Sequence, residues 1–410
     1  MFKCLVFQRT ALTSGAIADL QVIKASINED LTQKATSNIT CLFIPTNVQQ
    51  YDIVRLYDTK GQFVYWGVIN GITDNTIKCS QFQALYNDNF LIKEATSQTD
   101  KDFYANNSIA YVLANFLGKR HQGYISNGID LIDQDVKNNY LGISTNIIDT
   151  ASERLPFPTE NKVVNLENYI YEIFNNYSRI IVPIWVNVSN DLLATEDTQN
   201  LITTDKGDNI RVRKPLSPSN QHIMVGVYNP IGNLSAYGVN LNYNYKTLFD
   251  TYENISNLNI VKQDVDVNTI YIYRKDGSAL RGACCATNDG TIQSISSGYV
   301  VPNRLGTNKT KYIFDDDNDM IKLARNSMPT TQYNHKITFD ITFNEKNRFD
   351  DYILAQKIKF YENANNRLFD TLLTARKFEI EQNSDTINKA QFTLGKTRTN
   401  LTSLINKNGK

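Results

Sequence analysis

The sequence predicts an α+β, β-rich protein with two related β-barrel domains, a helix-containing insert and a further small β-rich insert. Three observations lead to this prediction. Short segments rich in β-branched and aromatic residues recur along most of the chain, few segments have a helical period, and two of the strand units resemble each other. At 410 residues the chain is long enough for about two to four domains.

The pattern of residues 1–92 predicts a first barrel domain made of strands and turns. Its strand segments are FKCLVFQ, ADLQVIKASI, NITCLFI, YDIVRLYD, QFVYWGVI and NTIKCSQF. Turn residues separate the last three, at Asp58–Gly61 and Thr73–Asn75. Gly61 is expected to supply the positive φ that closes the first of these hairpins.

Both faces of the strand QFVYWGVI are apolar. Strict alternation places Val64 and Trp66 on one face and Phe63 and Tyr65 on the other. We therefore expect one face to fill the barrel and the other to meet a neighbouring molecule.

Residues 93–202 are predicted to form the helix-containing insert. Ser108 can cap a helix whose apolar residues recur at intervals of three and four, up to Gly118. Asn165 can cap a second helix with an apolar face that runs from Leu166 to Tyr177. The strand RIIVPIWVNV follows it, and the polar stretch between the helices is expected to be loop.

Two separated segments, residues 203–265 and 336–405, are assigned to a second barrel domain. Their expected strands are IRVRKP, HIMVGVY, SAYGVNLNYNY, HKITFDITF, AQKIKFYE, RLFDTLLTARKFEI and NKAQFTLGKTR. Between these segments, residues 266–335 are expected to form the small β-rich insert, with a strand at Thr269–Tyr273 and a short helix at MIKLARNSM. The acidic run before this helix suits the positive end of the helix dipole.

Two hairpin units in the predicted barrels resemble each other. DIVRLYD aligns with QKIKFYE, and each continues after a polar turn into an apolar strand, QFVYWGVI or RLFDTLLT. Both units also end in a Gln-Phe pair, at residues 81–82 and 391–392. Chance similarity is the alternative explanation, because hairpins share alternation and turn chemistry. We favour duplication, since two related barrels per chain would let a trimer offer six near-equivalent barrels to a six-fold ring.

The composition disfavours several classes of protein. The 42 Lys and Arg residues balance the 42 Asp and Glu residues, so no global field attracts the chain to nucleic acid or to an anionic membrane. The five cysteines have no CxxC spacing, which predicts reduced, buried thiols instead of disulfides or a zinc site. No apolar run suits a signal peptide or reaches the roughly 18 residues of a membrane span. We expect the protein to fold in a cytoplasm.

No catalytic, cofactor-binding or metal-binding residue is predicted. The three histidines lie far apart in the sequence, and each is expected to have a structural or surface role: His121, His222 and His335. The triplet Gly395-Lys396-Thr397 imitates the end of a phosphate loop, but Ala390 stands where that loop requires a glycine.

The acidic residues also give no convincing site. A calcium loop could start at Asp315, Asp317 and Asp319, but Met320 stands at the glycine position and Asn326 at the glutamate position. The adjacent Cys284 and Cys285 are interpreted as packing residues. Paired carboxylates of a glycoside hydrolase leave almost no local signature, and such a pair stays open among four residues that we nevertheless assign to solvated loops: Asp133, Asp135, Glu153 and Glu160.

The order of these segments resembles the siphophage tail-tip hub, a tail-associated protein related to the myophage baseplate hub. The matching segments span nearly the whole chain: YDIVRLYDTKGQFVYWGVI, NTIKCSQF, NLENYIYEIFNNY with its strand, NTIYIYRKDG and later ATNDGTI, DDDND before a helix, YNHKITFDITF, and AQFTLGKTRTNLTSLI. Each segment is degenerate alone, so their order and spacing carry the resemblance.

The resemblance implies a structural virion protein at the phage tail tip, assembled in the host cytoplasm. It would be a homotrimeric baseplate hub with tail-tube-like barrels that closes the tail tube, docks on the distal tail protein ring and opens for DNA ejection. Further expected partners are the tape measure protein and receptor-binding or fibre proteins. No cofactor is expected because no cofactor motif is present, and no specific nucleic-acid binding is expected because the net charge is zero. Relatives often carry C-terminal wall-degrading or receptor-binding modules, and this chain ends about where such an extension would start.

Two other function classes stay open. A cell-wall carbohydrate-binding tail module is suggested by the 23 tyrosines, several of them in polar segments such as YGVNLNYNY, where rings can stack on sugars. A peptidoglycan-degrading tail enzyme is the third class, and we favour it least.

Overall fold

The computed structural model describes most of the chain. The described residues are 2–8, 15–61, 63–120, 141–143, 154–177, 179–189, 192–195, 199–203, 209–213, 221–228, 234–236, 239–241, 246–252, 254–262, 269–286, 292–295, 310–318, 320–327, 335–344, 348–382 and 384–395.

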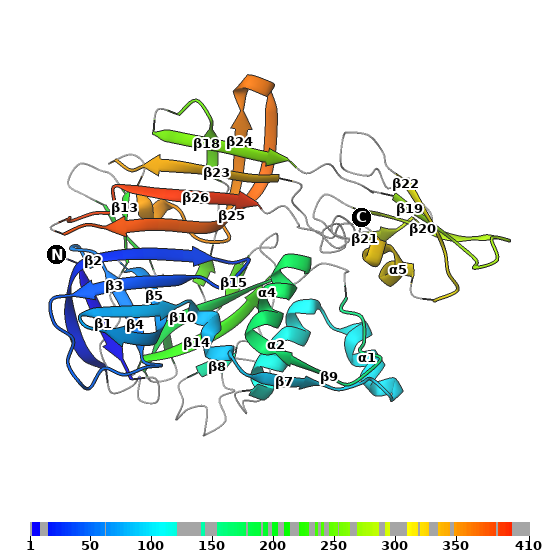
Figure 1. Cartoon of the computed structure of the whole chain (residues 1–410), viewed down its shortest axis with the longest axis horizontal. Helices are drawn as coiled ribbons and strands as arrows, with labels where there is room; N and C mark the ends of the chain where they lie inside the picture. Colours follow the sequence, from blue (N-terminus) through cyan, green and yellow to red (C-terminus); the bar gives the residue numbers. More distant parts are fainter. Residues whose placement is uncertain are drawn as a thin grey trace, which may run out of the picture.

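The first six strands form a closed antiparallel barrel (Figure 1). Their order is β1-β4-β5-β6-β3-β2, and β2 pairs back with β1. The predicted turns close two of its hairpins, because Gly61 has a φ of 75° and Asp74 a φ of 51°. The strands are β1 (Lys3–Phe7), β2 (Ala16–Asp30), β3 (Thr36–Cys41), β4 (Ile53–Tyr57), β5 (Phe63–Thr73) and β6 (Thr76–Ser80).

A second six-strand unit repeats this strand order. It runs β17-β24-β25-β26-β23-β18, so β17 takes the place of β1 and β18 the place of β2. Two features differ: β17 is parallel to β24, and among the described strands no pairing joins β17 to β18. The strands are β17 (Lys246–Phe249), β18 (Ile255–Lys262), β23 (His335–Thr342), β24 (Lys357–Glu362), β25 (Arg367–Ile380) and β26 (Lys389–Gly395).

The repeat extends to irregularities of the strands. A bulge skips Asn70 between β5 and β6, and another skips Thr374 between β25 and β26. These two residues are as far apart in the sequence as Val54 and Ile358 of the aligned hairpins, so one alignment covers both. The predicted match of the Gln-Phe pairs is wrong. Phe392 lies opposite Phe339 as Ile77 lies opposite Ile39, whereas Phe82 comes after β6 has ended.

The two units form one 12-stranded sheet because β2 of the first pairs with β25 of the second (Figure 1). One hydrophobic core runs through both units. It includes Leu56 and Ile77 of the first unit and Phe360 and Phe392 of the second, each fully buried.

A helical layer packs against the outside of the first barrel. A second hydrophobic core lies between this layer and the barrel, and it combines Phe7 and Val68 of the barrel with Leu113 and Ile170 of the helices. The elements are η2 (Phe82–Tyr86), β7 (Asn89–Ile92), α1 (Gln98–Asn106), α2 (Ile109–Arg120), β8 (Leu141–Ile143), β9 (Lys162–Asn165), α4 (Leu166–Tyr177), β10 (Ile180–Ser189), β11 (Leu192–Thr195) and β14 (Gln221–Tyr228).

Both predicted helices of this layer are present with their predicted caps. Ser108 accepts from the amide of Tyr111 at 3.2 Å, and Asn165 accepts from the amide of Asn168 at 3.1 Å. Helix α1 was not predicted, although Ser97 and Asp100 form a complete capping box at its start. This short local signal was present in the sequence and was overlooked.

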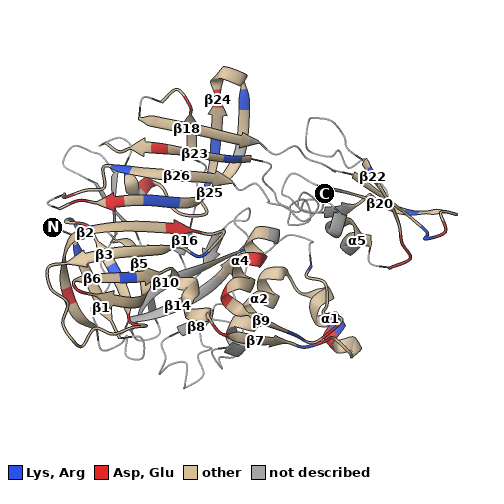
Figure 2. Cartoon of the chain, viewed as in Figure 1, with Lys and Arg blue, Asp and Glu red and all other residues tan. Residues whose placement is uncertain are grey.

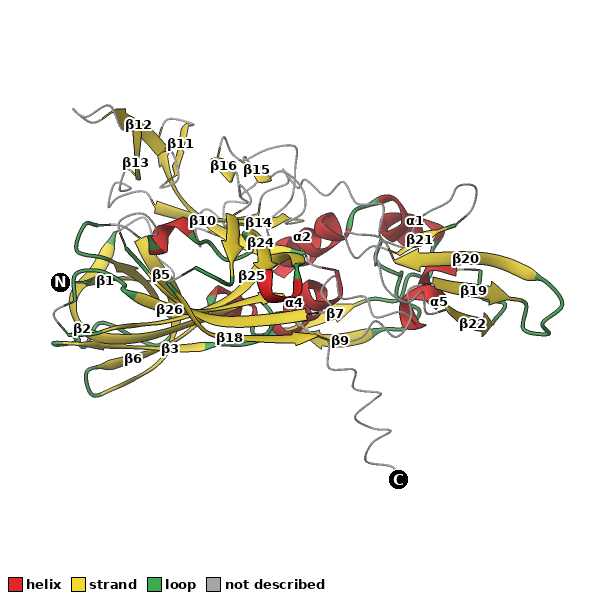
Figure 3. Cartoon of the chain, turned by 90° about the horizontal axis from the view of Figure 1, so that it is seen from above, coloured by secondary structure: helices red, strands yellow, loops and turns green. Residues whose placement is uncertain are grey.

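The remaining described elements are small. The small insert contains three antiparallel strands, a strand β22 parallel to β19, and the predicted helix α5 (Figure 3). The elements are β12 (Gln199–Thr203), β13 (Asn209–Arg213), β15 (Leu234–Ala236), β16 (Val239–Leu241), β19 (Thr269–Tyr273), β20 (Leu280–Ala286), β21 (Ile292–Ser294), β22 (Thr310–Phe314), α5 (Met320–Ser327), η3 (Phe349–Asp351) and η4 (Asn363–Asn365).

The domain boundaries drawn from the sequence stay predictions. Strand β14 lies inside the range 203–265 that we assigned to the second barrel, and it pairs with β10 of the helical layer. Within the described residues, no helix is both long and apolar enough to span a membrane.

The expected faces of β5 are corrected by a bulge. Leu56 lies opposite Tyr65 and Tyr57 opposite Phe63, so Val64 is skipped. Val64 and Tyr65 therefore both enter the barrel core, where strict alternation had separated them. Trp66 instead packs on Phe82 of the helical layer at a ring distance of 5.0 Å, so its face meets this chain's own helices.

Candidate functional site

The candidate site is the joint between the two barrel units. Residues Ala25–Asp30 of β2 run antiparallel to Ala375–Ile380 of β25. The amide of Leu31 donates to the carbonyl of Thr374 at 2.9 Å, which continues the ladder by one bond. Strand β2 is 15 residues long, and this length lets its first half close the first barrel while its second half holds the second unit.

An ion pair crosses the joint. Arg376 of β25 donates two hydrogen bonds to one carboxylate oxygen of Glu29 on β2, at 2.9 and 2.6 Å. It also donates to the carbonyl of Tyr352 at 2.7 Å and lies over the ring of Phe349 at 4.9 Å. Figure 2 shows basic residues on β25 beside acidic residues near the end of β2.

This ion pair is largely buried. The side chains of Arg376 and Glu29 are only 11% and 14% exposed. Burial raises the pKa of Glu29 above its ordinary value, and the Arg376 guanidinium offsets only part of this increase. The joint therefore depends on both partners, because removal of either one leaves a buried charge unpaired.

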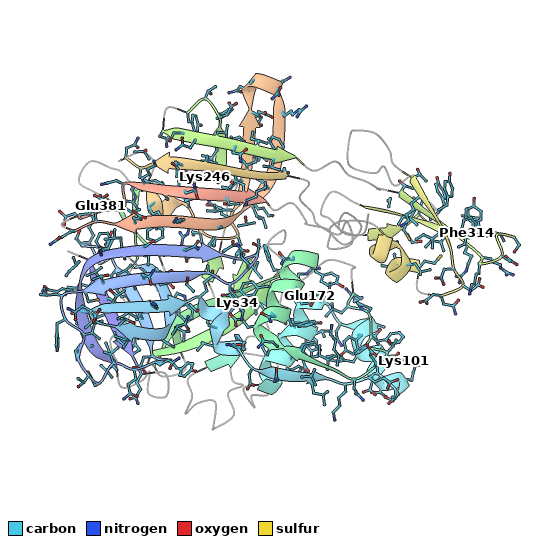
Figure 4. The ribbon with its side chains drawn as sticks, viewed as in Figure 1. Lys34, Lys101, Glu172, Lys246, Phe314 and Glu381 are labelled. Carbon is cyan, nitrogen blue, oxygen red and sulfur yellow. The ribbon has the colours of Figure 1, made fainter. Side chains whose placement is uncertain are left out.

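Gln81 attaches the joint to the helical layer. Its amide oxygen accepts from the backbone of Asp30 at 2.7 Å, and its amide nitrogen donates to the carbonyl of the same residue at 3.0 Å and to the hydroxyl of Tyr171 at 3.2 Å. Lys34, labelled in Figure 4, forms a 2.6 Å ion pair with Glu167 on α4. The end of β2 is therefore held by the second barrel on one side and by α4 on the other.

Two of the unpaired strand edges of the described barrel units correspond to the two sides of the joint. Strand β18 ends the 12-stranded sheet, and its side away from β23 pairs with no strand (Figure 1). Two of its apolar side chains are exposed, Leu258 by 36% and Val261 by 44%. The other edge belongs to the end of β5 at Gly71–Thr73, which extends beyond β4 and pairs only with β6.

Among the described residues, those that the sequence singled out for possible chemistry lie on separate elements. His335 begins β23, is buried, and has its ring 4.9 Å from that of Phe369. His222 lies on β14, and His121 is outside the described residues. Gly395 ends β26 with a φ of 65°, whereas Lys396 and Thr397 are not described. Glu160 is exposed, and its three possible acidic partners lie outside the described residues.

The acidic run before α5 is bound by an arginine. Arg281 donates to the backbone carbonyls of Asp315 at 2.7 Å and Asp317 at 2.8 Å, and to the side chain of Asn318 at 3.0 Å. Asp319 is not described. Among the described residues, no group of three or more His, Cys, Asp or Glu side chains could hold a metal ion.

The cysteines are free and buried, as predicted. Burial raises the pKa of Cys41 to about 12 and also raises the pKa values of Cys4, Cys79 and Cys285. These thiols are therefore protonated packing groups at neutral pH.

A ladder of four aromatic rings covers one face of the small insert. Tyr312 stacks on Tyr271 with ring centroids 5.7 Å apart and an interplanar angle of 19°. Tyr273 lies 6.2 Å from Tyr312 and 5.7 Å from Phe314. Tyr312 and Phe314 are 57% and 56% exposed, and Figure 4 labels Phe314 on the insert. The opposite face of these strands packs on α5 through Ile270, Ile272 and Ala324.

Comparison with solved structures finds phage tail proteins that are similar over nearly the whole chain. One chain of the phage P2 virion baseplate in its activated conformation is 11% identical to this chain, with a TM-score of 0.44 and coverage of 96% of this chain and 98% of the baseplate chain. A tail protein from Neisseria meningitidis is 10% identical, with a TM-score of 0.44 and coverage of 96% of both chains. A prophage tail protein from Listeria monocytogenes is 11% identical, with a TM-score of 0.43 and coverage of 98% and 97%.

No family model and no curated protein matches the sequence. These three solved structures are phage baseplate and tail proteins, the class that the order of the sequence segments indicated. At identities near 10%, these likenesses concern the fold alone.

Sequence reasoning missed the residues of the joint. Glu29 and Arg376 are separated by 347 positions, and each looks like an ordinary polar residue of an amphipathic strand. Gln81 was noticed only as part of a Gln-Phe pair. A local signal for the joint existed only in strand length, because a strand of 15 residues is longer than one small barrel needs.

Proposed function

We propose that this chain is a structural virion protein of the phage tail tip, a homotrimeric baseplate hub without catalytic activity. It closes the tail tube, docks on the ring of the distal tail protein, contacts the tape measure protein and receptor-binding or fibre proteins, and opens for DNA ejection. Assembly takes place in the host cytoplasm. The proposal combines the order of the sequence segments with the duplication inside the fold.

The duplication is the observation that carries the proposal. Two units with one strand order stand side by side in a single sheet, joined by β2 and β25. A chain with two such units needs only three copies to present six similar units in a ring, which is the symmetry needed to meet a six-fold tube. In the described residues, the polar side chains considered above do not converge on a cleft.

The test of this proposal is the mass of the full chain in solution. Light scattering at micromolar concentration is expected to give a trimer, and negative-stain images are expected to show a ring with three-fold symmetry. Because the net charge is zero, the mass should depend little on salt. A monomer in both low and high salt would contradict the trimer. Clearing of a cell-wall suspension by the purified chain would contradict the absence of catalysis.

A second candidate function, binding of cell-wall carbohydrate, is favoured by the aromatic ladder of the small insert. Exposed rings in a row offer flat apolar surfaces on which sugar rings can stack, and their tyrosine hydroxyls can bond sugar hydroxyls. The segment that first suggested this function, YGVNLNYNY, is described only at residues 239–241. The ladder on β19 and β22 is therefore the better candidate surface.

Removal of two rings tests this second candidate. The double variant Tyr312→Ala/Phe314→Ala is expected to bind purified host cell-wall polysaccharide about 5- to 150-fold more weakly, since each of the two lost aromatic contacts costs about 0.5–1.5 kcal/mol. Tyr252→Ala is the matched control, because Tyr252 is also an exposed aromatic residue but lies outside the ladder. Equal binding by the wild type and the double variant would exclude the ladder as a carbohydrate site.

A further inference from the structure

Among the described strands, those that form the joint inside the chain have counterparts with free edges in the other unit. In the first unit, β2 is covered on the side away from its own barrel sheet by β25 of the second unit. The equivalent of β2 in the second unit is β18, whose corresponding side is unpaired among the described strands. The equivalent of β25 in the first unit is β5, which ends in an edge of the same kind.

The equivalences are set by pairing, residue by residue. Lys78 of β6 and Thr393 of β26 are equivalent, because each pairs with the residue that follows the bulge of its neighbouring strand. Asn38 of β3 pairs with Lys78, and Thr338 of β23 pairs with Thr393, so Asn38 and Thr338 are equivalent as well. Ser26 lies opposite Asn38, and Asn259 lies opposite Thr338.

Two residues further along, Asn28 of β2 corresponds to Val261 of β18. The alignment of β5 with β25, which the two bulges confirm, makes Thr73 the counterpart of Lys377. Asn28 and Lys377 are direct partners across the joint.

We propose that β18 of one copy of this chain pairs antiparallel with the end of β5 of the next copy, with Val261 opposite Thr73 and Lys262 opposite Ile72. The inference rests on the proposed trimer and names the surfaces that form it. The contact is head-to-tail, because each copy offers β18 to one neighbour and β5 to the other, and such contacts form a ring when the rotation closes. In this register the last two residues of β18 lie opposite the end of β5, and an exposed strand edge of this kind is a ready template for such a partner.

The joint between copies differs from the joint within a chain in two ways. The positions of Glu29 and Arg376 are taken by Lys262 and Ile72, so no ion pair forms there. Strand β5 turns at Asp74, so the edge it offers, Gly71–Thr73, is shorter than the six-residue edge of β25. A shorter ladder is weaker, and we expect the ring to separate into intact chains before the units of one chain separate.

A disulfide can trap this contact. The amide of Leu31 donates to the carbonyl of Thr374, which makes this a hydrogen-bonded pair of the antiparallel ladder. Hydrogen-bonded and non-hydrogen-bonded pairs alternate along such a ladder. Glu29–Arg376 is therefore a hydrogen-bonded pair, and Asn28–Lys377 is a non-hydrogen-bonded pair. Non-hydrogen-bonded partners have Cα atoms about 4.5 Å apart, which a disulfide can bridge. Thr73 and Val261 are both exposed, so cysteines at these positions should leave each folded chain intact.

The experiment uses the full-length double variant Thr73→Cys/Val261→Cys, oxidised at micromolar concentration and separated on a non-reducing gel. A covalent trimer that returns to single chains on reduction is expected. The single variants and the displaced pair Thr73→Cys/Leu280→Cys are matched controls, and they should stay uncrosslinked because the native cysteines are buried.

Light scattering of the same samples under reducing conditions separates the two proposals. A reduced trimer that gives no crosslink overturns the β18–β5 contact and leaves the trimer standing. A monomer that gives no crosslink overturns both. Crosslinking of the displaced pair as efficiently as the designed pair would also overturn the contact, because it would show that bonding does not depend on the proposed register.

Discussion

Arg376→Met is expected to lower the free energy of unfolding of the chain by about 3–5 kcal/mol at pH 7, the usual cost of breaking a buried ion pair by removing one partner. The substitution leaves the Glu29 carboxylate buried without its guanidinium, and it removes the hydrogen bond to the carbonyl of Tyr352. Denaturant unfolding followed by circular dichroism measures the loss.

The same substitution should give a pH dependence of defined sign. Burial already raises the pKa of Glu29 in the folded protein, and loss of Arg376 raises it further. A carboxyl with a raised folded pKa adds stability below its unfolded pKa and loses that contribution as the pH rises through the folded value. The Arg376→Met variant should therefore recover part of its deficit as the pH falls from 7 towards the acidic range.

A second substitution shows whether the unpaired charge is the cause. Glu29→Gln in the Arg376→Met background removes the charge and should restore most of the lost stability, so the two substitutions should be strongly non-additive. If the deficit persisted in the double variant and did not change with pH, the loss would come from the contacts of Arg376 with the Phe349 ring and the Tyr352 carbonyl instead of from the ion pair.

Gly67→Ala is the second substitution with a large expected effect. An added Cβ at this residue of β5 would lie 2.7 Å from the carbonyl oxygen of Ser80 and would also collide with the hydroxyl of Tyr65. Overpacking of this kind costs about 1–3 kcal/mol, and the backbone contact points to the upper part of that range. Thermal unfolding of the purified variant measures the effect.

The same strand provides the control. Gly71→Ala adds its Cβ to open space, so it should change the melting temperature little. The second barrel also indicates a rescue. Its equivalents of Tyr65 and Gly67 are Phe369 and Thr371, so a ring without a hydroxyl stands there beside a residue with a Cβ. Tyr65→Phe should therefore restore part of the stability of Gly67→Ala, and no recovery would show that the Ser80 carbonyl alone determines the cost.

The sequence by itself determined the features whose causes are local. Ser108 and Asn165 cap the two predicted helices, and turns at Gly61 and Asp74 close the predicted hairpins, because capping and turn geometry depend on a few neighbouring residues. The duplicated hairpins were also recognisable, since equivalent strands need similar alternation. Their consequence, one strand order used twice, agrees with that reading.

Only the tertiary structure decided which distant strands meet. The bulge at Val64 places Val64 and Tyr65 together in the barrel core, and the alternation of apolar residues in the sequence does not predict it. The joint pairs β2 with a strand near the other end of the sequence, and its ion pair links residues that have no common local pattern. The register of strands far apart in the chain is set by the burial of whole faces and by edges that must be covered, and these are properties of the assembled sheet.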